Sequence, residues 1–83
     1  DLGNVYTFED VNRLIIYYRL AQENIGSNNL DIAEFNTNEA LKIVQIPELF
    51  NMKGTLYFLK GDTTNATVYW NKAKSLTDSL NKY

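Results

Sequence analysis

The stretch that decides the fold of this chain is residues 47–73, which read PELFNMKGTLYFLKGDTTNATVYWNKA. Pro47 fits the first turn of a helix, where its missing N–H is not needed. Apolar residues cover nearly the whole circumference of the segment that follows, which indicates a helix in the middle of the domain. Gly61 is typical of a helix end, and Asp62 or Thr63 can cap the next helix. The stretch therefore predicts two helices joined by a tight turn.

The spacing of apolar residues predicts two more helices on the N-terminal side. We expect four helices in all, over about residues 7–24, 30–44, 47–60 and 64–80. The first begins at Thr7, with Asp10 placed three residues later as in a capping box. The second contains weak helix formers at 36–38, so a break or bend is possible there. The residues expected to face inward on the first and fourth helices are Val11, Leu14, Ile15, Tyr18, Ala21, Ile25, Ala66, Tyr69, Trp70, Ala73, Leu76 and Leu80.

The two halves of the chain are similar when one is shifted by 33 residues along the other. The shift places small residues on small ones and large ones on large ones where helices must cross. The matched pairs are Ala33 with Ala66, Ala40 with Ala73, Tyr17 with Phe50 and Ala21 with Gly54. A period of this length indicates repeated helical hairpins.

The second half carries the pattern Phe50-x₂-Lys53-Gly54-x₂-Tyr57, then Ala66-x₃-Trp70 and Ala73. In this pattern the chain resembles the tetratricopeptide repeat (TPR) family, whose repeat is about 34 residues long. Lys53 departs from the usual Leu. The first half is a degenerate repeat, with Asn24 in the Tyr place and Thr37 in the large aromatic place.

The resemblance implies an all-α fold over a single domain, residues 1–83. We expect two antiparallel helix-turn-helix hairpins, at about 7–45 and 47–80, stacked as a short right-handed solenoid. Members of this family usually bind a peptide or helix on a concave face formed by the first helix of each repeat. The corresponding stripes here are Ile15, Tyr18, Gln22 and Ile25 on the first helix, and Glu48, Asn51, Thr55 and Phe58 on the third. The alternative for Ile15, Tyr18 and Phe58 is a place in the core.

Several function classes are disfavoured by composition. The chain has no His and no Cys, which removes the common nucleophile pairs and zinc ligands, and we expect no enzyme, cofactor or metal. A net charge of −2 without a basic stripe disfavours nucleic acid as a partner. No run approaches the ~18 apolar residues of a membrane span.

The sequence therefore predicts a module for protein–protein interaction that binds another protein or peptide. The alternative is a structural segment of a longer helical-repeat protein, or a homodimerisation module without a peptide ligand. Self-association is plausible because two repeats lack the extra helix that caps a solenoid, and fewer than three repeats are often marginal alone.

Overall fold

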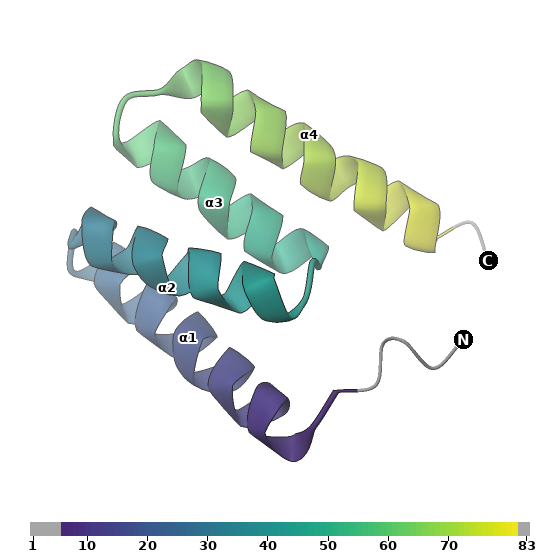
Figure 1. Ribbon diagram of the computed structural model, residues 1–83. Helices are drawn as coiled ribbons and strands as arrows, with labels where there is room; N and C mark the ends of the chain where they lie inside the picture. The colour runs from purple at the N-terminus through teal and green to yellow at the C-terminus, as the bar shows by residue number, and fades with distance from the viewer. Residues whose placement is uncertain (1–5, 82–83) are drawn as a thin grey trace.

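The protein is a row of four α-helices in the computed structural model, which describes residues 6–81 (Figure 1). The helices are α1 (Phe8–Gly26), α2 (Leu30–Ile43), α3 (Pro47–Leu59) and α4 (Thr63–Leu80). Consecutive helices run antiparallel, so α1 pairs with α2 and α3 pairs with α4, while α2 packs on α3 between the two hairpins. The all-α class and the two helix pairs are thus confirmed.

The helix ends follow local signals in the sequence. At the start of α1, the Thr7 side chain accepts from the Asp10 amide at 3.0 Å and the Asp10 carboxylate accepts from the Thr7 amide at 3.1 Å, which confirms the capping box. After α3, Gly61 adopts φ +89°, a left-handed conformation in which glycine has no steric penalty. The Asp62 side chain then caps α4 by accepting from the Asn65 amide at 3.0 Å.

The second helix is continuous through residues 36–38, which settles the question that its composition leaves open. The Asn36 amide donates to the carbonyl four residues earlier at 2.9 Å, and the Thr37 hydroxyl does the same at 2.8 Å. The Asn38 amide oxygen accepts from the Lys53 ammonium of α3 at 2.8 Å. The Asn36 and Thr37 side chains thus bond back to carbonyls of α2 itself, and the helix stays continuous over this segment.

The core combines small residues at the helix crossings with large ones from α3. Ala21, Ala33, Ala40, Ala66 and Ala73 are all buried. The central helix contributes Leu49, Phe50, Met52 and Leu56, as its apolar circumference predicts. The predictions for Val11 and Leu80 are wrong, because these side chains are 44% and 68% exposed. With 18 residues against the 13 of α3, α4 carries its last turn past the end of its partner.

Within the second hairpin, α3 and α4 approach closely at Gly54. A Cβ atom on Gly54 would lie 2.6 Å from Trp70 Nε1 and 3.0 Å from the Ala66 carbonyl oxygen. Under the 33-residue shift, Ala21 and Thr37 take the places of Gly54 and Trp70. The second hairpin thus pairs the smallest residue, Gly54, with a large one, Trp70, where the first hairpin has Ala21 and Thr37.

Polar contacts fix the second hairpin against the first. Lys60, at the end of α3, donates to Glu34 at 2.5 Å and to Asp31 at 3.0 Å near the start of α2. The hydrogen bond to Glu34, followed by that to Asp31, raises the pKa of the Lys60 ammonium. Lys53 also lies 5.1 Å from the centre of the Tyr69 ring, so this lysine joins α2, α3 and α4. These contacts join α3 to α2 and thus fix the second hairpin against the first.

Candidate functional site

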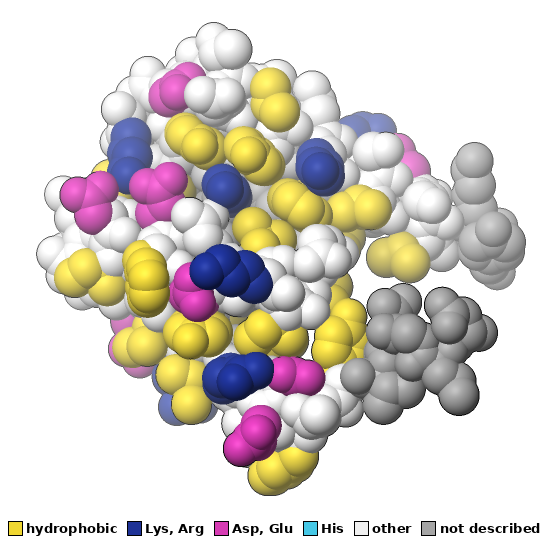
Figure 2. Space-filling view, viewed as in Figure 1, with side chains coloured by type: hydrophobic (Ala, Val, Ile, Leu, Met, Phe, Trp, Pro, Cys, Tyr) yellow, Lys and Arg dark blue, Asp and Glu magenta, His cyan; other side chains and the backbone are white. Residues whose placement is uncertain are grey.

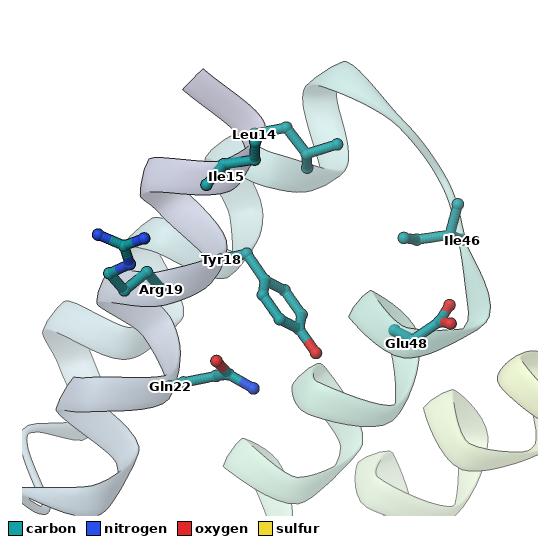
Figure 3. A pocket seen from close by; sticks show the side chains of 7 residues that line it. All are labelled: Leu14, Ile15, Tyr18, Arg19, Gln22, Ile46 and Glu48. Carbon is teal, nitrogen blue, oxygen red and sulfur yellow. The ribbon is translucent and has the colours of Figure 1, made fainter. Parts of the chain in front are cut away.

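An open groove lies between α1 and the start of α3 (Figure 3). Its volume is about 480 Å³, and it is lined by Leu14, Ile15, Tyr18, Arg19, Gln22, Ile46 and Glu48. Four of these residues belong to the two stripes that the sequence predicts as a binding surface, namely Ile15, Tyr18, Gln22 and Glu48. The fold therefore brings part of each stripe into the same groove.

One face of α1 forms one wall of the groove. Ile15, Tyr18 and Gln22 follow one another at intervals of three and four residues, so their side chains lie on one face of the helix. Ile15 is half exposed, at 50%, and its apolar surface is open to a ligand. Tyr18 is half-buried, and its ring crosses the groove with the hydroxyl directed toward α3 (Figure 3). This wall presents apolar surface with a phenol and an amide on it.

The opposite wall comes from the junction between the hairpins. Ile46 is the N-cap residue of α3 and has an extended backbone, because Pro47 restricts the residue before it. Its side chain is half-buried and forms the apolar part of this wall. Glu48 lies in the first turn of α3, where a carboxylate interacts favourably with the helix dipole. This wall thus presents one apolar side chain, Ile46, and one anionic side chain, Glu48.

The remaining four predicted residues lie outside the groove. Asn51 is exposed, and Ile25 and Thr55 are half-buried. Phe58 is 51% exposed and lies against Trp70 of α4, with ring centres 5.7 Å apart. The alternative of a core position is therefore wrong for Ile15 and Phe58, since half of each side chain is exposed.

Three residues of the groove are absent from the predicted stripes: Leu14, Arg19 and Ile46. Leu14 and Arg19 directly precede and follow members of the α1 stripe on the helix, and the groove is wide enough to include them. Ile46 lies between helices, where helical spacing gives no information. The Ile46-Pro47 pair is the signal that could have identified it, because proline holds the preceding residue extended.

The groove can bury apolar side chains of a ligand and hydrogen-bond to its polar groups. Leu14, Ile15 and Ile46 supply the apolar surface, while the Tyr18 hydroxyl and the Gln22 amide can each donate and accept. Arg19 and Glu48 add one charge of each sign. Over residues 6–81, no group of His, Cys, Asp or Glu is arranged to hold a metal ion. The mixture of apolar, aromatic and amide groups is typical of surfaces that bind proteins.

A second surface combines aromatic rings with lysines. Tyr69 of α4 stacks between two rings of α3, with its centre 6.3 Å from that of Phe50 and 5.5 Å from that of Tyr57. Lys72 lies 4.9 Å from the centre of Phe50. Burial raises the pKa of the Tyr57 hydroxyl. Figure 2 shows one face of the molecule, on which apolar side chains alternate with charges of both signs. The stacked rings join α3 to α4.

Comparisons with protein-family models, curated proteins and solved structures find no match to this chain. In the part of the chain that the structure describes, no helix is both long and apolar enough to cross a membrane.

Proposed function

We propose that this chain is a module for protein–protein interaction, built from two TPR-like hairpins stacked as a short right-handed solenoid. Its binding site is the groove between α1 and α3, and its ligand is a segment of a partner protein. The module acts by binding, without catalysis of its own. The chain's lack of His and Cys and its resemblance to a family of binding modules support this role.

The observation that carries the proposal is the groove itself. It joins residues of α1 to Glu48, 33 residues after Ile15, at the places that the repeat pattern assigns to a concave surface. Ile15 leaves half of its surface exposed, although the sequence would allow a place in the core. An isoleucine that is open to solvent beside a tyrosine and an amide provides a contact site for a protein ligand.

The chemistry of the groove defines the segment that fits it. One or two apolar side chains of the ligand would lie between Ile15 and Ile46. Polar groups of the ligand backbone would pair with Tyr18 and Gln22. A cation in the segment would approach Glu48 and an anion would approach Arg19, so a ligand with both charges is favoured over a uniformly charged one.

The test is selection of short random peptides on the immobilised protein, followed by NMR titration of the isotope-labelled chain with the strongest binder. We expect the largest shifts at the amides of Ile15, Tyr18, Gln22 and Glu48. The spectra of the free chain provide the control for folding. A selection that enriches no peptide, or shifts confined to the outer side of α4, would rule the proposed site out.

A structural role within a larger helical assembly is the second candidate. The observation that favours it is a pair of exposed apolar side chains, Ile16 and Leu20, on a face of α1 outside the groove. Such a surface gains from being covered by another helix.

A further inference from the structure

The outer face of α1 is an unpartnered helix surface that is distinct from the groove. Glu9, Arg13, Ile16, Leu20 and Glu23 follow one another at intervals of four, three, four and three residues, so they form one continuous stripe. Ile16 is 54% exposed and Leu20 is 38% exposed. Helix α1 lies at one edge of the row of helices, with α4 at the other (Figure 1). The stripe is therefore accessible to another molecule.

The corresponding face of the second hairpin is buried at two positions and half-buried at two more, Ile46 and Lys53. The 33-residue shift places Ile16 on Leu49 and Glu23 on Leu56, which are 0% and 2% exposed in α3. In α1 the first of these two positions is still apolar, because it is Ile16, but the second carries the carboxylate of Glu23. Because Glu23 replaces a buried leucine, a partner helix must offer a cation opposite Glu23 in addition to apolar surface opposite Ile16.

The opposite edge of the molecule is a poor match for the apolar part of the stripe. The outer side of α4 is mostly polar and carries Asn71, Lys74, Ser75, Asp78 and Ser79, with Val68 as a single exposed apolar residue on the same face. Head-to-tail stacking of two copies would place Ile16 and Leu20 against these polar groups. The apolar stripe therefore does not lead to an open-ended chain of copies.

We propose that the stripe binds the same stripe of a second copy, with the two α1 helices antiparallel. When Ile16 faces the partner's Leu20, the twofold axis passes at the level of residue 18. The same symmetry then places Arg13 opposite the partner's Glu23. Both pairs occur twice, so the two apolar contacts at the centre are flanked by an ion pair at each end. The stripe is thus complementary to itself in shape and in charge.

Neighbouring registers lack this complementarity. A shift that places Leu20 opposite the partner's Glu23 sets an apolar side chain against a carboxylate. The reverse shift places Arg13 opposite the partner's Ile16 and leaves the cation without an anion. Arg13 already contacts Asp10 of its own chain at 2.6 Å, but its side chain is 56% exposed and can reach a second carboxylate. Of these three registers, only the one centred on residue 18 gives Arg13, Ile16, Leu20 and Glu23 complementary partners, while Glu9 lies outside the paired part of the stripe.

The size of the surface sets the strength of the dimer. An α-helix of 19 residues is ~28 Å long, and one face of it buries less than the ~800 Å² per partner of a standard interface. The dimer is therefore weak, with a dissociation constant on the order of 10–100 µM. It forms at high protein concentration, or where the chain is held at high local concentration.

The test is sedimentation equilibrium of the whole chain from about 5 µM to about 1 mM, a range that brackets this constant. We expect a monomer–dimer equilibrium for the wild type. Ile16→Ser should raise the dissociation constant at least tenfold. Ile15→Ser is the matched control, because it changes the same residue type at 50% exposure on the groove side and should leave the dimer intact.

The charges provide an independent test that does not depend on apolar contacts. Glu23→Arg places two cations together at each end and should weaken the dimer by at least tenfold, as should Arg13→Glu. The double variant Arg13→Glu/Glu23→Arg restores both ion pairs and should bring the affinity back toward that of the wild type. Circular dichroism verifies that each variant is helical. A chain that is monomeric throughout the range, or a double variant no better than the single ones, overturns the proposal.

Discussion

The close approach at Gly54 gives a prediction whose sign can be worked from the structure. Alanine at this helix-interior position gains about 1 kcal/mol of helix propensity over glycine. Its Cβ, however, would lie 2.6 Å from Trp70 Nε1 and 3.0 Å from the Ala66 carbonyl oxygen. Overpacking of this kind costs about 1–3 kcal/mol. Gly54→Ala should therefore destabilise the chain by roughly 1 kcal/mol net, which lowers the Tm by about 4–8 °C.

The same substitution should cost less when Trp70 is made small. Trp70→Thr together with Gly54→Ala reproduces the Ala21 and Thr37 combination of the first hairpin. In the Trp70→Thr background the indole contact is gone and only the 3.0 Å approach to the Ala66 carbonyl remains, so Gly54→Ala should cost about 1 kcal/mol less than in the wild type. Urea unfolding of the four proteins, followed by circular dichroism, measures this coupling as a double-mutant cycle. Equal effects of Gly54→Ala in the two backgrounds would refute the packing argument.

Two further predictions concern hydrogen bonds and charge. Hydrogen bonds from the Thr7 and Asn65 amides lower the pKa values of Asp10 and Asp62 below 3.8. The stability that these carboxylates contribute is therefore present above pH 3.8 and is lost as the pH falls through their folded-state pKa values. Asp62→Asn keeps a capping side chain but removes the titrating carboxylate. Urea unfolding should therefore show a smaller loss of stability between pH 5 and pH 2 for this variant than for the wild type. An unchanged pH profile would contradict this prediction. The Lys53→Ala and Asn38→Ala variants should each cost about 1–2 kcal/mol, with a coupling of about 1 kcal/mol in a double-mutant cycle, whereas strict additivity would show that the 2.8 Å contact contributes nothing.

The architecture could be predicted from the sequence because its signals are local. Helix ends at Thr7, Pro47 and Gly61 depend on backbone conformation and capping within a few residues. The small residues at the helix crossings and the apolar circumference of α3 reflect helical periodicity, which is visible in one dimension. All four helices lie within two residues of the predicted ends.

The exposure of individual apolar residues could not be predicted in the same way. Ile15 and Ile16 are neighbours of the same type, and the sequence does not show that one faces a groove and the other an edge. Leu80 continues the inward period of α4, but α3 is too short to cover it. The hydrogen bond of Asn38 with Lys53, fifteen residues later on α3, is a contact that no local rule contains.

The central claim is that the groove between α1 and α3 binds a protein segment, and a matched pair of variants tests it most directly. The measurement is calorimetric affinity of the selected peptide for the wild type, Ile15→Ser and Ile16→Ser. Half of the Ile15 side chain remains to be buried, so Ile15→Ser should lose about 1 kcal/mol, or about fivefold in Kd, while Ile16→Ser binds as the wild type does. Equal affinity for all three proteins, or a loss confined to Ile16→Ser, would contradict the assignment of the groove as the binding site.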